Sequence, residues 1–416
     1  MTQTNRPQSQ VGHLPDFENT EQAFAHLNSG QLKKALVLFS TVGNPHLVKF
    51  GKLMMNVAIA LRIPVGWAIR PTVYSHFCGG ETISGCEKTI ATLAENQVRT
   101  ILDYSAEGKD SESEWDATQA EIMKAIRATD GDDRHAFSVF KVSGLASTAL
   151  LEKVGASLHP LDALIRQPED LTVQEQSAWE RVQERFFALC AESASIGKPV
   201  FIDAEESWIQ PTIDALAECA MRKWNQNEVI VYNTVQLYRT DRLDYLKKLT
   251  EAAKTEGFKI GVKLVRGAYM EKERERALSL GYPSPIQPSK NATDRDFDAA
   301  LEWCVAHLNH VSLCAGSHNE NSNALLCQNM DKLGIARNDK RVWFAQLLGM
   351  SDPISFNLAC ANYQVAKYVP YGPIAETIPY LIRRAEENTS VAGQTSRELE
   401  LIRREKERRN RTTVRR

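Results

Sequence analysis

Two features that this chain of 416 residues lacks exclude whole classes of protein. No stretch approaches the roughly 20 consecutive apolar residues that cross a bilayer, and the most apolar early run, Met54–Ile69, is interrupted by Arg62 and Pro64. The formal net charge is only −2, so bulk electrostatics do not favour nucleic acid. We therefore expect neither a membrane-spanning segment nor a nucleic-acid partner.

Paired cysteine motifs and targeting signals are also missing. The eight cysteines are scattered, and neither a CxxC pair nor a secretory signal accompanies them. Free thiols in a reducing compartment are the expectation. The first ten residues contain a single arginine and no amphipathic pattern, which gives little support to a mitochondrial transit peptide. We predict a cytoplasmic location, or a mitochondrial one if the source is a eukaryote.

The motifs of several common enzyme classes are absent as well. Asp103, Tyr104 and Ser105 follow the first predicted strand, where a dinucleotide-binding fold would carry a glycine-rich phosphate loop. There is no GxSxG nucleophile motif. No HxH follows the first strand, and His318 alone is expected to form hydrogen bonds rather than to bind zinc. We expect no metal.

What the sequence does contain is an alternation of short β-rich runs with long amphipathic segments such as Asp241–Gly257 and Asp294–Asn309. Eight runs are predicted to be strands: Arg99–Ser105, Ala136–Gly144, Lys198–Glu206, Glu228–Tyr238, Lys259–Tyr269, His310–Asn319, Arg341–Gly349 and Tyr363–Gly372. Most are apolar throughout, as in strands buried on both faces. Eight strand–helix repeats favour an α/β fold of the closed (β/α)8 type, with an open doubly wound sheet as the alternative.

The same pattern predicts three parts of the chain. Residues 1–95 form an N-terminal helical arm, because Leu32–Ser40 and Lys49–Leu61 repeat apolar residues at helical spacing. Residues 96–395 form the barrel, and residues 396–416 form a basic helical tail. We expect the tail to be a solvated helix that frays, and the alternative is a basic patch that touches an anionic membrane surface.

Polar side chains close nearly every predicted strand, where barrel enzymes place their chemistry. Lys141 and Asp203 end adjacent strands, which lie about 4.8 Å apart, so an ion pair between them is expected. Glu205 and Glu206 follow Asp203. The other polar residues near strand ends are Asn233, Gln236, Lys263, Arg266, Tyr269, Ser317, His318, Asn319, Gln346 and Tyr368.

A helix after the last strand carries a candidate anion site. Tyr380, Arg383 and Arg384 are spaced at i, i+3 and i+4, which puts them on one helical face. Two guanidinium groups beside a tyrosine can bind a carboxylate. The alternative is a solvent-exposed basic patch paired with Glu386 and Glu387, and the position after the last strand favours the anion site.

Seven stretches resemble the proline dehydrogenase family, in its monofunctional, mitochondrial-type branch. They are FCGGET (Phe77–Thr82), FIDAEES (Phe201–Ser207), YNTVQLYRTD (Tyr232–Asp241), KLVRGAYMEKER (Lys263–Arg274), SHNE (Ser317–Glu320), QLLGM (Gln346–Met350) and KYVPYGPIAETIPYLIRRAEEN (Lys367–Asn388). The resemblance extends from about residue 20 to about residue 405 in family order. It implies a distorted (β/α)8 barrel that binds FAD without a covalent bond. The implied reaction oxidises L-proline to Δ1-pyrroline-5-carboxylate, and a quinone receives the electrons.

The resemblance also implies roles for single residues. Arg383 and Arg384 resemble the pair that binds the proline carboxylate. Lys141 resembles the lysine that roofs the substrate, and Asp203 resembles its partner. The expected walls around the pyrrolidine ring are Tyr269, Leu347, Tyr368 and Tyr380. The expected FAD contacts are Gln236, Lys263, Arg266, Gly267, Ala268, Ser317 and His318, together with Glu387, which resembles the acid that follows the arginine pair.

One departure and three rival readings remain at this point. Lys263 stands where many bacterial members carry an arginine near the flavin N5. Hydroxyproline dehydrogenase is the nearest rival, although Tyr368 packed on the ring would leave little room for a hydroxyl group. A Schiff-base aldolase or dehydratase with Lys141 or Lys263 as nucleophile is the second. A non-catalytic barrel used as a scaffold is the third.

Overall fold

Eight parallel strands form a closed barrel at the centre of the molecule. The computed structural model describes residues 14–44, 46, 51, 66–105, 110–158, 170–390 and 394–414. The strands follow chain order, and β8 pairs with β1 to close the barrel. They are β1 (Arg99–Tyr104), β2 (His135–Lys141), β3 (Val200–Asp203), β4 (Val231–Gln236), β5 (Ile260–Val265), β6 (Val311–Gly316), β7 (Val342–Leu347) and β8 (Val365–Tyr371). Each predicted run coincides with one strand of the barrel. The prediction of a (β/α)8 barrel is therefore confirmed, and the alternative of an open doubly wound sheet is wrong.

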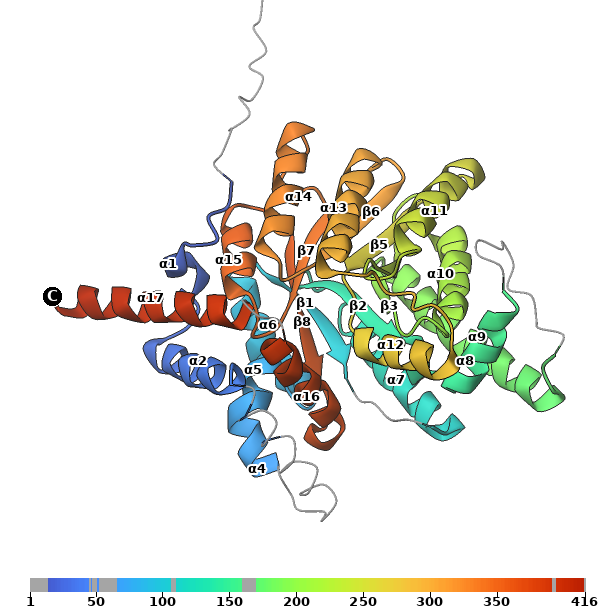
Figure 1. Cartoon of the computed structure of the whole chain (residues 1–416), viewed down its shortest axis with the longest axis horizontal. Coiled ribbons are helices and arrows are strands. Elements are labelled where there is room, and N and C mark those ends of the chain that lie inside the picture. Colours follow the sequence, from blue (N-terminus) through green and yellow to red (C-terminus); the bar gives the residue numbers. More distant parts are fainter. Residues whose placement is uncertain are drawn as a thin grey trace, which may run out of the picture.

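Helices surround this barrel, as Figure 1 shows. They are α7 (Glu112–Arg127), α8 (Thr148–Ala156), α9 (Val173–Ser195), α10 (Gln210–Trp224), α11 (Arg242–Glu256), α12 (Met270–Leu280), α13 (Lys290–Ala306), α14 (Glu320–Lys332), α15 (Asp352–Cys360) and α16 (Ile374–Ser390). Local sequence sets their ends. Thr172 and Glu175 form a capping box at the start of α9, and Gly257 ends α11 in the left-handed conformation with φ of 81°.

The strands have two apolar faces, as a barrel requires. Their outward side chains join the helices in one large buried cluster. Their inward side chains form a second cluster, which includes Phe137, Phe201, Tyr232, Trp343 and Tyr368. The rings of Phe137 and Phe201 stack at 4.1 Å. Aromatic rings thus fill the inside of the barrel, and the polar residues described below lie at the carboxyl ends of the strands.

Helices precede the barrel in the chain. The described ones are α1 (Thr20–Ala23), α2 (Ser29–Val42), α4 (Gly66–Ile69), the π-helix η1 (Arg70–Tyr74), α5 (Ser75–Phe77), the 3₁₀ turn η2 (Ser84–Cys86) and α6 (Glu87–Glu95). Ile90 and Leu93 of α6 belong to the outer cluster of the barrel. The predicted helical segment Lys49–Leu61 lies almost entirely outside the described residues. The division at residue 95 stays a prediction.

The FCGGET stretch is shaped by close packing against β8. A Cβ atom at Gly79 would lie 2.4 Å from Val369 Cγ1, and one at Gly80 would lie 2.5 Å from the carbonyl carbon of Gly85. Gly80 also forms a bridge with Tyr371 of β8. A larger side chain at Gly79 would push the segment away from β8, and one at Gly80 would collide with the following turn, so the two glycines allow the close packing of this stretch.

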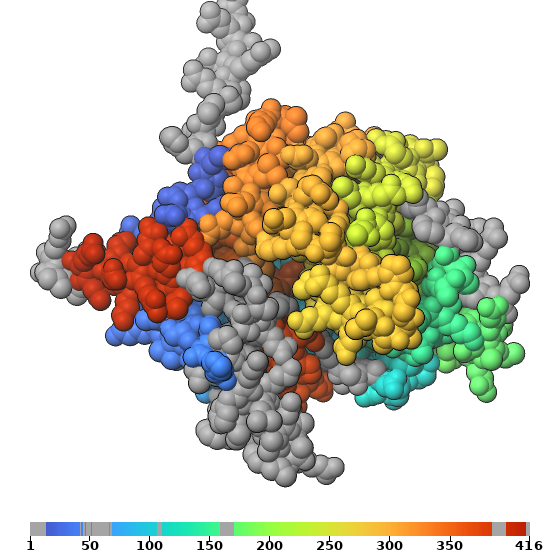
Figure 2. All heavy atoms as spheres, in the orientation of Figure 1, coloured from blue at the N-terminus to red at the C-terminus, as the bar shows by residue number. Residues whose placement is uncertain are grey.

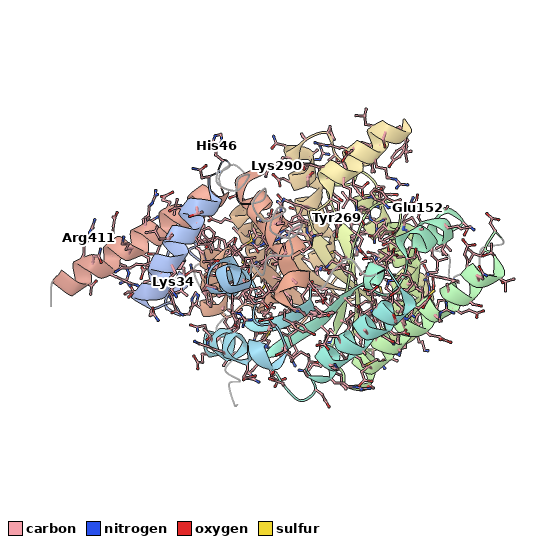
Figure 3. The ribbon with its side chains drawn as sticks, turned by 90° about the horizontal axis from the view of Figure 1, so that it is seen from below. Lys34, His46, Glu152, Tyr269, Lys290 and Arg411 are labelled. Atoms are coloured by element: carbon pink, nitrogen blue, oxygen red, sulfur yellow. The ribbon has the colours of Figure 1, made fainter. Side chains whose placement is uncertain are left out.

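The C-terminal helix, α17 (Gln394–Val414), packs against the N-terminal helices α1 and α2. Figures 1 and 3 show α17 and α2 side by side at one end of the molecule. Leu401 and Ile402 are buried together with Phe24, Leu32 and Phe39. The Arg409 guanidinium donates to the carbonyl groups of residues 24 and 27, each at 2.8 Å. The expectation of a solvated, fraying helix is therefore wrong, because the helix has an apolar stripe and distant partners to cover it.

Candidate active site

A buried carboxylate at the end of β3 organises the mouth of the barrel. Asp203 lies opposite Lys141 in the register of β2 and β3, and the Lys141 Nζ is 2.7 Å from Asp203 Oδ2. The expected ion pair is therefore present. Lys263 of β5 donates to the other oxygen, Oδ1, and also to the hydroxyl group of Tyr368 on β8. Residues from four strands thus meet in one hydrogen-bonded group.

Charge in this group is set by burial and by the two lysines. Burial opposes the ionisation of Asp203, but the ammonium groups of Lys141 and Lys263 outweigh it and hold the pKa of Asp203 well below its usual range. Burial likewise opposes the charged form of Lys141, yet the attraction of Asp203 and Asp103 raises its pKa. Two lysines, the carboxylate of Asp203 and the nearby side chain of Asp103 therefore lie together at the mouth.

Asp103 is a site residue that the sequence analysis did not select. It ends β1, is buried, and accepts a hydrogen bond from Ser105 Oγ at 3.1 Å. Burial raises the pKa of Asp103, Lys141 opposes the rise, and the nearby Asp203 adds to it. Its position at the end of an apolar strand is the signal in the sequence that marks it.

Glu205 is a second buried acid beside this group. Its side chain accepts the Ser143 N–H at 2.9 Å and the Ser143 hydroxyl group, which ties the loop after β3 to the turn after β2. Gln236 Nε2 donates to the Glu205 carbonyl oxygen at 2.7 Å. Burial raises the pKa of Glu205 to about 7, against the opposing effect of the Ser143 hydrogen bonds. Gln236, a candidate flavin contact, is thus held by the same loop.

Tyr269 lies just before α12, a helix that two polar contacts tie to the loop after β3. Ser207 Oγ donates to Glu273 at 2.6 Å, and Lys272 pairs with Glu206. Lys141 and three acids surround Tyr269 closely enough to act on its ionisation, and burial raises the pKa of its phenol. Figure 2 shows α12 (yellow) on the near face of the molecule in that view. Tyr269 therefore lies next to the Asp203 group, as a substrate wall would.

The candidate flavin residues after β5 and β6 are brought together by Arg266. Its guanidinium donates to Asp294 at 2.6 Å, to Ser317 Oγ at 2.9 Å and to Ser322 Oγ at 2.9 Å. Ser317 is buried, whereas Gly267 and Ala268 are exposed. Gly267 has a φ of 133°, and a Cβ atom there would lie 2.4 Å from the Tyr238 ring. Arg266 is thus held in a fixed position by protein groups.

His318 is a neutral imidazole in this arrangement. Burial, with help from Lys367, Arg384 and Arg266, lowers the pKa of His318 to about 3. Its Nδ1 atom forms a 2.9 Å hydrogen bond with Ser351 Oγ. The influence of Arg384 on this ionisation places α16 near the loop after β6. His318 can therefore offer a hydrogen bond, but no charge, to a bound group.

The face predicted on the helix after the last strand is present in α16. Tyr380 and Arg384 are buried, Arg383 is partly exposed, and the Arg384 guanidinium lies 5.2 Å from the Tyr380 ring centre. Leu347 packs against both the inner barrel cluster and the cluster that contains Tyr380, so α16 lies beside the mouth. A solvent-exposed basic patch does not fit the burial of Arg384. The side chain of Glu387 lies outside the described residues.

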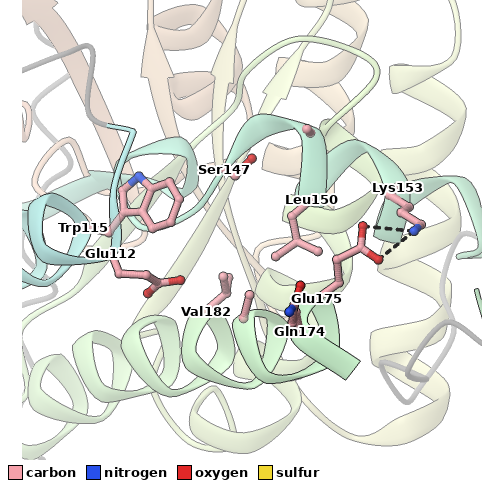
Figure 4. A pocket seen from close by; sticks show the side chains of 10 residues that line it. Glu112, Trp115, Ser147, Leu150, Lys153, Gln174, Glu175 and Val182 are labelled. Atoms are coloured by element: carbon pink, nitrogen blue, oxygen red, sulfur yellow. Dashed lines mark hydrogen bonds and ion pairs between the residues drawn. The ribbon is translucent and has the colours of Figure 1, made fainter. Parts of the chain in front are cut away.

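A pocket of about 420 Å³ lies elsewhere, among α7, α8 and α9. Figure 4 shows Trp115, Leu150 and Val182 on its walls and the Lys153–Glu175 ion pair at one side. It contains none of the predicted site residues and lies among helices outside the barrel. This pocket is therefore separate from the group of charged residues at the strand ends.

The described part of the chain contains neither a metal-binding cluster nor a disulfide bond. Among the described residues, no group of three or more histidine, cysteine or acidic side chains could hold a metal ion. None of the eight cysteines forms a disulfide bond, and all of them lie in the described part of the chain. None of the helices described has the length and apolar character needed to cross a membrane.

Comparison with known proteins assigns this barrel and its charged mouth to an enzyme family. Residues 86–397 match the proline dehydrogenase family. The chain is 32% identical over 335 residues to the carbapenem antibiotics biosynthesis protein CarD of Pectobacterium carotovorum, covering 80% of this chain and 83% of that protein. It is 29% identical to the mitochondrial proline dehydrogenase 1 of Dictyostelium discoideum, covering 97% and 76%.

A solved structure is similar in fold. Proline utilization A (PutA) from Bdellovibrio bacteriovorus, inactivated by N-propargylglycine, superposes with a TM-score of 0.67 at 18% identity. The match covers 90% of this chain and only 38% of the PutA chain, so this chain spans well under half of that protein. At this identity the likeness concerns the fold.

The fold and the charged strand ends are those of a TIM-barrel enzyme. The chain belongs to the proline dehydrogenase family, because the family match covers most of its length. The family, the fold and the oxidoreductase class predicted from the sequence are therefore confirmed. This membership supports proline oxidation, the first step of proline catabolism, as its reaction.

Proposed function

We propose that this protein oxidises L-proline to Δ1-pyrroline-5-carboxylate with FAD as cofactor and passes the electrons to a quinone. The observation that carries the proposal is the buried group of Lys141, Asp203, Lys263 and Tyr368 at the barrel mouth. Arg384 lies beside that mouth on α16. Such a site offers a carboxylate receptor on one side and fixed cations on the other.

The substrate carboxylate would bind to Arg383 and Arg384. Because Arg384 is largely shielded from water, its hydrogen bonds to an anion would be stronger than on an open surface. Tyr380 packs below the guanidinium and limits its movement. The pyrrolidine ring would then lie between Leu347 and the tyrosines at positions 269, 368 and 380.

The charge of the mouth would help the substrate to lose a proton. Proline carries a cationic secondary amine in water, and a cationic nitrogen cannot release a hydride from the neighbouring carbon. Lys141 and Lys263 are two cations against the single low-pKa carboxylate Asp203. Nearby positive charge lowers the pKa of an ammonium group. Glu205 lies close to Lys141 and has a pKa near 7, which is suitable for accepting that proton.

The donors at the mouth fit a flavin. Lys263, Gln236, Ser317 and the neutral His318 are hydrogen-bonding groups on three neighbouring strands or the loops that follow them. A flavin presents carbonyl oxygens and ring nitrogens that such groups bind. When bound, FAD would supply the acceptor for the hydride. The fixed positions of Lys263 and Arg266 would place positive charge near that cofactor without any movement during the reaction.

The Schiff-base alternative fits the lysines poorly. A nucleophilic lysine must be neutral, and it reaches that state through burial among apolar groups or beside other cations. Lys141 and Lys263 are instead both paired with Asp203, and the pKa of Lys141 is raised. Lys141 should therefore remain charged, and the ion pair of Lys263 with Asp203 is not the apolar or cationic surrounding that a nucleophilic lysine needs.

A quinone acceptor would require access to a membrane, and we retain peripheral membrane contact as part of the proposal. Arg404 and Arg408 of α17 pair with Glu18 and Glu21, so part of the basic charge of the tail is already neutralised. Contact through residues 396–416 would then be weak and sensitive to salt. Flotation with liposomes that contain anionic lipid, at low and high salt, tests it, and absence of binding at low salt would exclude it.

One experiment tests the central proposal. The purified protein should show the visible absorption band of a flavin, and L-proline added without oxygen should bleach it. Faster bleaching by trans-4-hydroxy-L-proline would support the cofactor assignment and would identify hydroxyproline as the substrate. A colourless protein that takes up no added FAD, or a flavin that neither imino acid reduces, would overturn the proposal.

A further inference from the structure

Two neighbouring residues of the C-terminal helix contact two loops at the barrel mouth, one of which carries the candidate flavin groups Ser317 and His318. Glu398 of α17 accepts the backbone N–H of Ser351, at 2.9 Å, in the loop between β7 and α15. Arg397 donates to Glu320 at 3.2 Å, and Glu320 begins α14 directly after the Ser317–His318–Asn319 stretch. Both loops at the β6–β7 side of the mouth are therefore held from outside the barrel.

Ser351 has an unusual backbone conformation and an unusual partner. Its φ of 53° and ψ of 40° are left-handed, which few residues other than glycine adopt. It precedes the first residue of α15, where a serine side chain usually caps the helix. The Ser351 side chain forms no such cap, because its Oγ atom is hydrogen-bonded to His318 Nδ1 at 2.9 Å.

The side chain of Glu398 caps the N-terminus of α15 in place of the Ser351 side chain. Its buried carboxyl group interacts with the backbone N–H groups of both Ser351 and Asp352, the first orphan donors of α15. The Ser351 hydroxyl group can therefore face His318, since another part of the chain satisfies the helix end.

The other acid at the start of α15 is already paired with cationic side chains, which leaves the capping role to Glu398. The adjacent acid, Asp352, is engaged by Lys367 Nζ at 2.6 Å and by His26 Nε2 at 3.3 Å. His26 also stacks on Phe356 of α15 at 4.0 Å, which brings the N-terminal helices to the same place. The buried side chains of Leu401 and Ile402 hold α17 in its position beside this cluster.

We propose that Glu398 is a positioning residue for His318, so that the terminal helix α17 is part of the cofactor site. The chain of contacts runs from Glu398 to the Ser351 backbone and from the Ser351 hydroxyl group to His318. Glu398 lies beyond residue 397, where the family match ends. The inference rests on the proposed function in one respect, namely that His318 contacts FAD.

The test compares Glu398→Ala with Glu398→Gln and a matched control, Glu407→Ala. Glu407 is an exposed acid of the same helix and contacts only Arg411 at 3.9 Å among the described ion pairs. Release of FAD from the diluted holoenzyme gives its Kd, and a redox titration gives the flavin midpoint potential. We expect Glu398→Ala to raise the Kd at least ten-fold and to shift the potential. Glu398→Gln, which keeps an acceptor oxygen, should behave like the wild type, as should Glu407→Ala.

A double-mutant comparison shows whether the effect passes through His318. If it does, Glu398→Ala should have no further effect on the FAD Kd in a His318→Ala background. Independent, multiplying effects would overturn the proposal, as would an unchanged Kd and potential in Glu398→Ala. Should Glu398→Ala fail to fold, Ser351→Ala keeps the backbone cap and removes only the hydroxyl group. It must then raise the Kd similarly, and a wild-type Kd would overturn the proposal.

A further readout separates this inference from the proposed function. Nitrogen NMR of labelled histidine reports the hydrogen bonding of His318 in the purified protein whether or not FAD is present. Glu398→Ala should shift the His318 signals and Glu407→Ala should not. If the wild type binds no FAD, the proposed function fails, and the His318 signals still decide whether Glu398 positions this residue.

Discussion

The ammonium group of Lys141 lies 2.7 Å from the carboxylate of Asp203, at paired positions on two neighbouring strands of the barrel. Lys263 approaches the same carboxylate from β5, so one acid serves two lysines. Asp203 is therefore the carboxylate that contacts both lysines directly.

Replacing Asp203 by asparagine should destabilise the fold strongly. The buried ammonium group of Lys263 and the partly exposed one of Lys141 would lose their shared counter-ion, and removal of one partner from a buried pair typically costs about 3 kcal/mol or more. Denaturant unfolding measures this loss. Asp244→Asn is the control, because the exposed Asp244–Lys248 pair on α11 should contribute less than about 1 kcal/mol. Equal stability of the two variants would mean that the Asp203 group is hydrated and carries no buried charge.

The stability of the protein should depend on the ionisation of Glu205. Burial raises its pKa from 4.5 to about 7, so the folded protein retains a proton that the unfolded chain releases from about pH 4.5 upward. The contribution of Glu205 to the free energy of unfolding is therefore complete below pH 4.5 and is lost as the pH rises to about 7. The loss is at most roughly 3 kcal/mol.

Glu205→Gln cannot titrate and provides the comparison. The thermal midpoint of this variant should rise relative to that of the wild type between pH 5 and 7, and the difference should stay constant above pH 7.5. Gln also keeps an oxygen that can accept the Ser143 N–H, which limits structural change. A difference that does not vary with pH would show that Glu205 has an ordinary pKa.

Replacing Arg384 by alanine should weaken proline binding. Loss of a charge-assisted hydrogen bond to the carboxylate costs about 1.5–3 kcal/mol, which corresponds to roughly a ten- to hundred-fold rise in KM. Steady-state kinetics measure it, and Arg384→Lys should recover only part of the loss because lysine lacks the planar fork. Arg411→Ala, at an exposed position of α17, is the control. An unchanged KM in Arg384→Ala would exclude Arg384 as a group that binds the substrate carboxylate.

The strands and the charged mouth could be predicted because their signals are local. Runs such as KIGVKLVRG place an apolar strand directly before its polar end, and the position of Asp203 after FI indicated the ion pair with Lys141. Asp103 also follows an apolar run, but its approach to Lys141 and Asp203 depends on how β1 packs in the closed barrel, which the sequence of one strand does not show. The contact of Glu398 with Ser351 could not be predicted, because it joins residues 47 positions apart through backbone geometry.

The docking of α17 was missed for a related reason, and it gives the last prediction. Its apolar stripe is narrow, and the residues that cover Leu401 and Ile402 stand at the other end of the chain.

Ile402→Ala should cost about 2–4 kcal/mol locally, since a fully buried side chain is truncated. Faster hydrogen exchange in residues 394–414, and in α1 and α2 with them, would show that these helices separate together. Val37→Ala on α2 removes a similar side chain that is 65% exposed and should change little. Because α17 also carries Glu398, undocking of this helix should loosen FAD as well, whereas unaltered exchange in Ile402→Ala would mean that the stripe contributes little to holding α17 in place.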